Sequence, residues 1–505
     1  MAQCILVGLY DMLDFETLRI LENAFGMPVV SFTTLEYPAL EAGLNADDLK
    51  ERGVKYVFPE FYRKNRRRIA SMSMDDLDAY QIKIEKKLGI ENNLMLVSFG
   101  KSAARFNDYR KSRNYQLLHL MFVEKLLEEN DVAGFFNSRG SYLFNLIADA
   151  CLRKGVVSMH LRMDSFTMSR LYASDSQGRL LGMEETFNEL LNGNRASFDQ
   201  LTLQEADEAL EAFQEAPVRA AVVEANAQSF VRNAKLALKS GFSSIKRSAQ
   251  LWFSCESDRV NGELDPPWNT VPRWPMKALR MLAVEHLGVV NGNPDMKAKF
   301  IYLPLHLAPD TTDLYFGKDY CHHEGFVAQL AKRLPSEYRL YVKDHTSMVG
   351  DRAVSFYKTL QAIPNVEMID PRVSTFDLIR NCAATLTVAG TAGWETYLSG
   401  KPVIVLGDIF YDFLPNVLKA GIFDADFVVK VRDYLDNFQR KDDEIVAAAE
   451  ALYASSYPVG EGHDGIHDAT PVVARREAAL TKEVFDKWGG WILENEPLAQ
   501  KKRPE

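Results

Sequence analysis

Cysteine is scarce in this chain, and the few cysteines present form no recognisable pattern. There are five in 505 residues, no two of them form a CxxC pair, and the count is odd. They are Cys4, Cys151, Cys255, Cys321 and Cys382. This spacing argues against a disulfide framework and against a zinc site built from cysteines. We therefore expect reduced thiols, as in a cytoplasmic protein.

Long apolar runs and an excess of positive charge are also missing. No apolar run reaches the ~18 residues that a membrane-spanning helix needs, and the opening residues MAQCILVG lack the basic segment and cleavage site of a secretory signal. Lysine and arginine number 59 against 69 aspartates and glutamates, so the net charge is −10, which does not favour a dedicated nucleic-acid binder. The GxSxG, P-loop and HExxH motifs are absent.

The composition is otherwise that of a globular protein large enough for two or three domains. Hydrophobic residues make up 47% and charged residues 25% of the chain. In its first part, short apolar strands alternate with helical patterns, which predicts βαβ units and a parallel sheet. The strands are expected at 4–9, 55–58, 132–136 and 156–161, and the helices at 14–24 and 142–153.

The middle of the chain has a helical pattern. Residues 202–248 are rich in Ala, Glu, Leu, Gln and Lys at helical spacing, and they predict two long helices separated near Pro217. Prolines and tryptophans between 265 and 275 then break the pattern, which predicts a linker or a packed irregular segment there.

Five apolar strands with helices between them make the second alternating region the clearest part of the sequence. The strands are expected at 300–306, 339–343, 366–369, 384–388 and 402–406, and the helices at 325–333, 351–362, 375–381 and 393–398. This pattern is typical of a doubly wound sheet, in which ligands bind beyond the carboxyl ends of the strands.

We therefore expect an α/β protein with two doubly wound, Rossmann-like domains that face each other across a cleft, and a helical middle segment. The predicted division is 1–200 for the first domain, 201–275 for the helical insertion and linker, 276–490 for the second domain, and 491–505 for a frayed tail.

Polar residues gather where three strands of the second region end. His306 closes the first of these strands, Lys343 and His345 follow the next, and a glycine-rich turn follows the strand at 384–388. Because the carboxyl ends of parallel strands lie at one edge of a sheet, we expect these residues at the ligand-binding edge. Lysine and histidine can both donate to phosphate oxygens. A histidine that only packs at a strand end is the alternative.

The turn formed by Gly390, Thr391, Ala392 and Gly393 opens a helix. Its glycines would let the backbone approach a ligand closely, and the N–H groups of a helix start favour an anion such as phosphate. Thr391 could add a hydroxyl donor. Glu395, one turn into the helix, could accept from ribose hydroxyls or complement the helix dipole. A turn that caps its helix and binds nothing is the alternative.

Three further patterns are weighed as metal or anion sites. The Cys-His-His stretch at 321–323 has no further ligand at a suitable spacing, so solvated loop residues are the expected reading. Asp-x-Asp triplets occur at 76–78 and 424–426, but neither follows a strand at the phosphate edge, and we expect no metal. The basic run at 63–68 is either a solvated helix face or a contact for an anionic glycan or lipid surface.

From residue 299 to residue 412 the chain resembles bacterial capsule polysaccharide biosynthesis proteins, which include retaining β-Kdo transferases. The matching stretches keep their order and spacing over about a fifth of the chain. They are YLPLH at 302–306 with PD at 309–310, LP at 334–335, LYVKDH at 340–345, GDR at 350–352, FY at 356–357, PNV at 364–366, GTAGWE at 390–395, GKPVI at 400–404 and FY at 410–411.

The resemblance implies a GT-B glycosyltransferase whose second domain binds a nucleotide sugar, often CMP-Kdo, and whose first domain faces the acceptor. In that family a Lys-Glu-His-Pro motif contacts the nucleotide phosphate. Here Asp344 replaces the glutamate, Thr346 replaces the proline, and the Pro-Glu after the first strand becomes Pro309-Asp310. These changes keep the charge and the histidine, so we expect nucleotide binding to be retained.

We therefore expect a cytoplasmic glycosyltransferase of bacterial surface polysaccharide synthesis that needs no metal and no other cofactor. It would transfer a sugar, first of all Kdo from CMP-Kdo, to a glycan or glycolipid acceptor, with peripheral association at the inner face of the cell membrane as an option and with no nucleic-acid partner. The residues expected to hold the nucleotide sugar are His306, Lys343, His345, Gly390, Thr391, Ala392 and Glu395.

Acceptor chemistry is expected from strand-end loops of the first domain, near 138–140 and 160–164, with His160 and Asp164 as candidate catalytic residues. Two other functions stay open. A GT-B-like nucleotide-sugar epimerase would form product without an acceptor. A non-catalytic nucleotide- or glycan-binding relative would bind a cytidine nucleotide without turnover.

Overall fold

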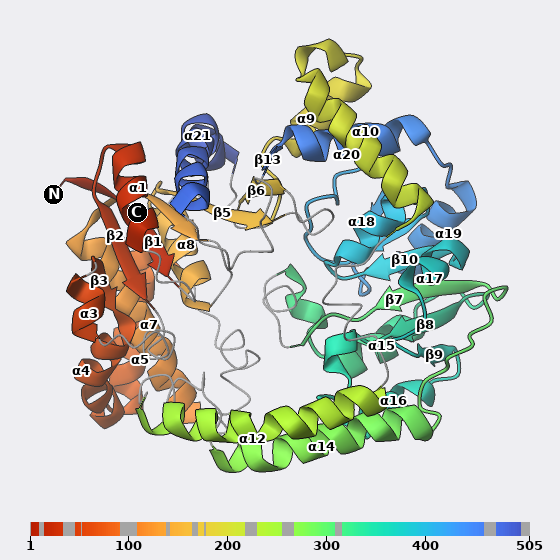
Figure 1. Ribbon diagram of the computed structural model, residues 1–505, viewed down its shortest axis with the longest axis horizontal. Coiled ribbons are helices and arrows are strands. Elements are labelled where there is room, and N and C mark those ends of the chain that lie inside the picture. The colour runs from red at the N-terminus through yellow and green to blue at the C-terminus, as the bar shows by residue number, and fades with distance from the viewer. Residues whose placement is uncertain are drawn as a thin grey trace. The chain divides into compact units, whose positions relative to one another are not determined.

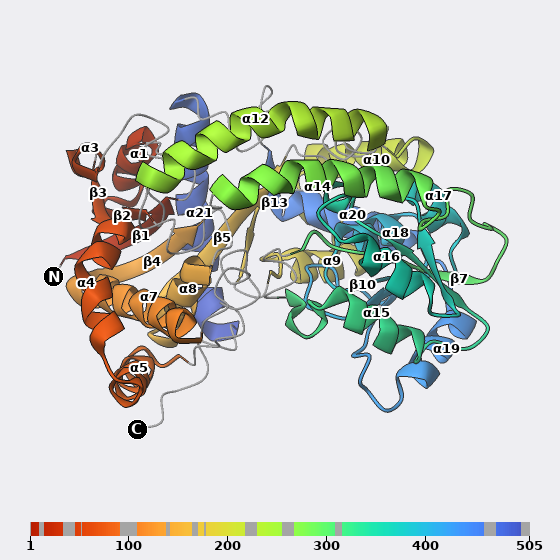
Figure 2. The same cartoon turned by 90° about the horizontal axis from the view of Figure 1, so that it is seen from below.

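The chain forms two compact units, each built from segments that are separate in the sequence. The computed structural model describes residues 2–9, 15–33, 46–51, 53–90, 109–137, 142–163, 170–175, 178–217, 230–254, 267–308, 316–458 and 471–495. The first unit comprises residues 1–181, 250–265 and 456–505, and the second comprises 182–249 and 266–455. Figures 1 and 2 show their elements.

The first unit is built on a seven-stranded sheet with the strand order β13-β6-β5-β4-β1-β2-β3. The five strands from β5 to β3 pair in parallel, whereas β6 is antiparallel to both β5 and β13. The strands are β1 Gln3–Leu9, β2 Val29–Thr33, β3 Val54–Val57, β4 Asp131–Asn137, β5 Val157–Met163, β6 Arg170–Ser174 and β13 Ser456–Pro458. Its helices are α1 Phe15–Phe25, α3 Ala46–Glu51, α4 Phe58–Ser71, α5 Met74–Leu88, α7 Tyr109–Glu129, α8 Tyr142–Arg153 and α21 Pro471–Asn495.

Alternation along β1 shows why this sheet is covered on both faces. Cys4 and Leu6 belong to a core cluster that includes residues of α4, α5, α7 and α8. Ile5, which lies between them, belongs to a second cluster with Val484 and Ile492 of α21. Since successive side chains of a strand point to opposite faces, an uninterrupted apolar run needs a partner layer on each side.

The second unit contains a six-stranded, all-parallel sheet with the order β12-β11-β10-β7-β8-β9. The strands are β7 Phe300–Pro304, β8 Arg339–Lys343, β9 Val366–Ile369, β10 Ala384–Thr387, β11 Val403–Val405 and β12 Val417–Lys419. The helices after β7 are α15 His323–Ala331, α16 Val354–Gln361, α17 Thr375–Asn381, α18 Thr391–Leu398, α19 Phe427–Asn437 and α20 Asp442–Ala454. All five strands predicted for this region are present, and β12 is an addition.

Both sheets confirm the predicted fold class, a GT-B-like α/β protein with two doubly wound domains. In the second sheet the chain runs from β7 through β8 to β9, then crosses to β10 on the other side of β7 and continues to β12. The five parallel strands of the first sheet follow the same scheme around β1. This is the strand order of Rossmann-like domains. The cleft between the domains stays a prediction.

The predicted long helices of the middle segment are confirmed, and one expectation about this region is wrong. The two predicted helices are α10 Gln200–Glu215 and α12 Phe230–Ser254, and the segment also contains α9 Met183–Leu191 and α14 Pro267–His286. α12 and α14 lie side by side in both views (Figures 1 and 2). The irregular segment expected at 265–275 is helical from Pro267 on, with Pro272 and Pro275 inside α14. Its later residues Ala278, Met281 and Val284 are buried in the core of the second sheet at helical spacing, and this packing outweighs the local preference of proline.

The compact units divide the chain differently from the predicted boundaries. Residues 456–505 belong to the first unit rather than to the domain predicted for 276–490. The physical reason is that β13 pairs with β6, and α21 packs on α1 and β5. α21 extends to Asn495, so the tail predicted to be frayed from 491 begins inside a helix.

Within the described residues, neither a membrane-spanning helix nor a disulfide bond is found. None of their helices is long and apolar enough to cross a membrane. Among their cysteines, Cys4, Cys151, Cys321 and Cys382 are free thiols, and burial raises the pKa of Cys151 to about 12.

Candidate functional site

Three neighbouring strands of the second sheet end in the residues that the sequence singles out. In the sheet, β7 lies between β10 and β8. β7 leads to His306, β8 leads to the segment 343–345, and β10 leads to the turn at 390–393. The connection after β7 leads to β8 and the connection after β10 leads to β11, in opposite directions, so the topological switch point of the sheet lies between β7 and β10. In doubly wound sheets a crevice opens there, beyond the carboxyl ends of the strands.

Lys343 ends β8 with its side chain turned into the protein. The residue is only 4% exposed. Its Nζ donates to the Val373 carbonyl at 2.6 Å and to Thr375 Oγ1 at 2.9 Å. The ammonium therefore fastens the connection between β9 and α17 to the end of β8, and its positive charge lies close to the edge of the sheet.

Asp344, at the start of the loop that follows β8, holds this loop in place through hydrogen bonds. Its side chain is fully buried, and it accepts hydrogen bonds from the His345 backbone N–H at 2.9 Å, from Arg352 Nε at 2.9 Å and from the Tyr357 hydroxyl at 2.7 Å. Burial, and then the charge of Asp344, raise the pKa of Tyr357 far above its usual value. The carboxylate is thus engaged by three protein donors, which suits a positioning role.

Arg352 connects Asp344 to the loop that follows the neighbouring strand β7. Besides Asp344, its guanidinium donates to the His306 carbonyl at 3.3 Å and contacts His323 Nδ1 at 2.7 Å. It also lies over the Phe356 ring, 4.4 Å from the centroid. One arginine, whose side chain is 10% exposed, therefore links the loops after β7 and β8. No role was predicted from the sequence for Arg352, Tyr357 or His323, although the first two belong to the stretches that carry the family resemblance.

His345 is half-buried and starts the short 3-10 turn Thr346–Met348. Its Nδ1 accepts from the Ser347 backbone N–H at 3.2 Å. An accepting Nδ1 places the hydrogen of the neutral ring on Nε2, so the second ring nitrogen is a donor.

The turn after β10 is held closely against His306. His306 Nε2 accepts from the Ala389 N–H at 3.5 Å, the long end of the hydrogen-bond range. A Cβ at Gly390 would lie 2.9 Å from His306 Cε1 and 2.7 Å from Thr387 Oγ1. The structure thus brings His306 and the turn together, and close approach explains the glycine at 390.

The start of α18 lacks a side-chain cap, so its first backbone N–H groups are suited to an anionic ligand. Gly390 is the N-cap, and no side chain caps the helix. The Gly390 carbonyl accepts from the buried Tyr411 hydroxyl, which was not predicted. Thr391 is exposed, whereas Ala392 and Glu395 are partly buried. Burial, followed by the charge of Glu395, raises the pKa of Tyr411 well above its usual value.

The candidates of the first unit are not brought into a described site. His160 lies within β5, 3% exposed, opposite Ser174 of β6 and Asn137 of β4. Asp164 and residues 138–140 lie outside the described residues, as does Pro309-Asp310. The roles proposed for His160 and Asp164 stay predictions.

Within the described part of the chain, no group of three or more His, Cys, Asp or Glu side chains could hold a metal ion. In the Cys-His-His stretch, His322 Nδ1 accepts from the Gly325 N–H at 3.1 Å and so caps α15. Asp424 and Asp426 both pair with Lys430. In the Cys-His-His stretch and in the Asp-x-Asp triplet at 424–426, these side chains are therefore engaged in contacts within the protein.

A protein-family model and several solved structures resemble this chain. Residues 291–415 match the family described as capsule polysaccharide biosynthesis protein. KpsC from Thermosulfurimonas dismutans, a beta Kdo 2,7 transferase, is 14% identical over 83% of this chain and 98% of that one, with a TM-score of 0.35. The beta Kdo 2,4 transferase of KpsC from the same organism is 12% identical over 65% and 85%, with a TM-score of 0.32.

A UDP-GlcNAc 2-epimerase from Neisseria meningitidis, bound to UDP-GlcNAc, is 12% identical over 90% of this chain and 98% of that one, with a TM-score of 0.23. A search among curated proteins found no match. The assignment of the fold depends on the two sheets themselves, because these structural likenesses are low.

Proposed function

We propose that this member of the capsule polysaccharide biosynthesis protein family, identified through residues 291–415, is a glycosyltransferase that uses a nucleotide sugar. The observation that supports this function is that His306, His345 and the glycine turn follow three neighbouring strands of the second sheet, with His306 close to the turn. A glycan or glycolipid would be the acceptor. CMP-Kdo is our first choice of donor, because the matching stretches resemble those of β-Kdo transferases.

The donor phosphate is proposed to lie between His345 and the start of α18. Nε2 of His345 can donate to a phosphate oxygen, and the helix start offers backbone N–H groups and the Thr391 hydroxyl. Lys343 would act through its charge, because its ammonium donates to Val373 and Thr375. Glu395 is proposed to accept from the ribose hydroxyls.

These donors would act mainly in the step that releases the nucleotide. As the bond between the sugar and the phosphate breaks, negative charge grows on the departing phosphate, and donors already aimed at that position stabilise the transition state. For the acceptor side we propose the region that follows β5, where Asp164 comes directly after Met163. His160 itself is buried within the strand.

The replacement His345→Ala should weaken nucleotide binding while the protein stays folded. A hydrogen bond to a charged group contributes about 1.5–3 kcal/mol, so the Kd should rise roughly tenfold to a hundredfold. The ligand is first chosen by thermal shift with CMP, CDP, UDP and GDP, since a ligand at 100 times its Kd stabilises by about 2.7 kcal/mol. Its Kd is then measured by calorimetry.

The matched control is His286→Ala, which removes an exposed histidine at the end of α14 in the same unit. Equal affinity in wild type, control and His345→Ala would remove His345 from the site. Product formation from the nucleotide sugar without any acceptor would favour an epimerase over a transferase.

A further inference from the structure

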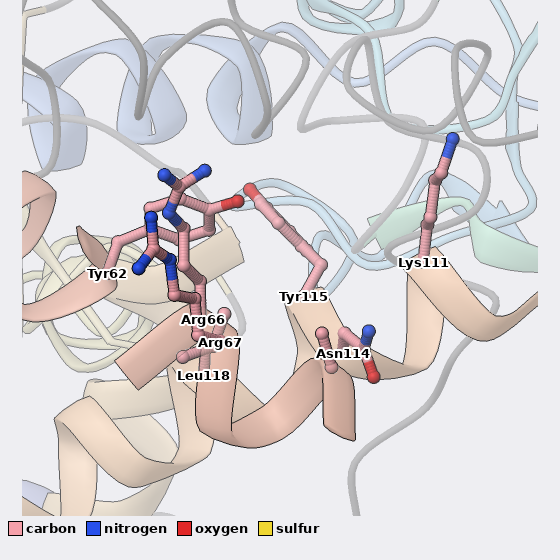
Figure 3. A pocket seen from close by; sticks show the side chains of 8 residues that line it. Tyr62, Arg66, Arg67, Lys111, Asn114, Tyr115 and Leu118 are labelled. Carbon is pink, nitrogen blue, oxygen red and sulfur yellow. The ribbon is translucent and has the colours of Figure 1, made fainter. Parts of the chain in front are cut away.

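A pocket of about 270 Å³ lies between α4 and α7 of the first unit, far in sequence from the family match. Figure 3 shows its side chains, with the hydroxyls of Tyr62 and Tyr115 pointing toward one another and the guanidinium groups of Arg66 and Arg67 on the α4 side. The lining residues are Tyr62, Arg66, Arg67, Ala70, Lys111, Asn114, Tyr115 and Leu118.

Contacts between α4 and α7 place this pocket on the ligand side of the first sheet. Phe58, which directly follows β3, packs against Phe122 in the middle of α7. Farther along α4, the Ile69 carbonyl accepts from Arg110 in the first turn of α7. Because α7 leads at its other end into the start of β4, its first turns extend beyond the carboxyl ends of the strands. Ligands of doubly wound sheets bind on that side.

The charge of the lining has one sign. Three of its residues are cations, Arg66, Arg67 and Lys111, and the described side chains that line it include no carboxylate. A concave site lined by positive charges raises the local concentration of anions.

The geometry points to an oxyanion site: this pocket binds a phosphate or carboxylate group carried by a carbohydrate. Arginine presents a planar fork of donors that matches such groups in two parallel hydrogen bonds. Tyrosine hydroxyls add neutral donors or acceptors for the hydroxyls of a sugar. In the proposed transferase the anionic group belongs to the acceptor, and only this last step rests on the proposed function.

The shape of the pocket favours a carbohydrate over a membrane surface. Tyr62, Tyr115 and Leu118 are 5%, 8% and 2% exposed, so the floor is part of the packed core and a ligand must enter a hollow. Two other cations of the same helix do not line it: Lys64 is exposed, as Arg67 is, and Arg68 lies over the Tyr80 ring, 5.5 Å from the centroid. The basic run at 63–68 thus divides into a pocket wall and a solvated face.

The test compares two double variants of the full chain that each remove two positive charges from α4. Arg66→Gln/Arg67→Gln alters the pocket, and Lys64→Gln/Arg68→Gln is the matched control on the solvated face. Calorimetry with glucose 6-phosphate, glucuronate, inorganic phosphate and glucose gives the affinity for each probe. We expect the phosphorylated or acidic sugar to bind more tightly than inorganic phosphate, with no binding of glucose. Its Kd should rise at least tenfold in the pocket variant and less than about twofold in the control.

Three outcomes would overturn the inference. Absence of binding to the wild type by every anionic probe removes the site, and equal weakening in both double variants assigns the effect to general surface charge. Binding of anionic but not neutral phospholipid vesicles, lost in the pocket variant, together with no binding of the sugars, would replace the carbohydrate with a lipid headgroup. Binding of CMP, CDP, UDP and GDP is measured in parallel. If none of these nucleotides binds while the sugar phosphate binds, the proposed function fails and the pocket stands.

Discussion

Gly390 has no room for a side chain, and this single position connects two of the candidate ligand-binding strand ends. Its backbone N–H donates to Thr387 Oγ1 at 3.1 Å, and the His306 ring lies against its Cα. A larger residue must move His306, Thr387 or the turn itself. Because each of these helps to shape the edge of the sheet, the geometry at one residue is coupled to the whole proposed phosphate site.

The replacement Gly390→Ala should therefore destabilise the protein and weaken nucleotide binding. The added Cβ would meet atoms at 2.7 and 2.9 Å, and overpacking of this kind costs about 1–3 kcal/mol. Urea denaturation measures the loss, and calorimetry measures the affinity. Gly292→Ala is the control, because its Cβ would meet nothing nearer than Asp370 Oδ2 at 4.0 Å. If both variants unfold and bind alike, the turn is looser than its contacts indicate.

At the scale of elements, a charged cluster with one buried member lies where α10 packs on α20. Arg195, in the short 3-10 turn before α10, pairs with Asp207 of α10 at 2.7 Å and with Glu450 of α20. The Glu450 side chain is only 2% exposed. Burial raises its pKa from 4.5 to about 7, with Arg195 opposing this shift and Asp207 adding to it. Two carboxylates thus share one arginine between packed helices.

This cluster should make the stability of the second unit depend on pH. A raised pKa means that the folded protein binds the proton more tightly, so the contribution of Glu450 is fully present below pH 4.5 and is lost as the pH rises through about 7. Glu450→Gln keeps the shape without the charge. The variant should gain on the wild type between pH 5 and pH 8, by at most about 3 kcal/mol of unfolding free energy.

Denaturation curves at several pH values give this difference directly. Glu211→Gln, which neutralises an exposed carboxylate on α10, should show no such trend. A constant offset between Glu450→Gln and wild type from pH 5 to pH 8 would mean that Glu450 titrates normally in the folded protein.

At the scale of the whole molecule, acidic residues are numerous but dispersed. There are 69 aspartates and glutamates, yet the described ones form no group that could hold a metal. Both Asp-x-Asp triplets are engaged locally: the Asp76 carboxylate accepts from the hydroxyl of the N-cap Ser73, Asp78 pairs with Arg113, and Asp424 and Asp426 pair with Lys430. Charge on a bound phosphate would then be offset by donors of the second unit.

Transfer activity is accordingly expected to survive excess EDTA. His345, the charge of Lys343 and the start of α18 supply the positive potential that a divalent ion supplies elsewhere. The rate is measured with and without EDTA at constant ionic strength. Loss of activity that magnesium or manganese restores would contradict this expectation, and Asp424 and Asp426 would be the first residues to replace.

Much of the second unit could be predicted from the sequence because its signals are local. Short runs such as residues 300–305 and 340–342 are continuously apolar, as strands buried on both faces must be, and glycine and polar residues mark where they end. The resemblance in 299–412 added the order of these stretches. Four strands were not predicted: the edge strands β12 and β13, which have three residues each, and β2 and β6 of the first sheet.

What the sequence by itself determined is therefore the existence of the second sheet and the residues that follow its strands. Only the tertiary structure decided that β7 lies between β8 and β10, so that His306, His345 and Gly390 follow three neighbouring strands. It also decided that Lys343 and Asp344 turn inward, that α14 continues through two prolines, and that residues 456–495 return to the first unit. Strand partners and buried donors are chosen by packing between segments distant in the chain, and no local pattern carries that information.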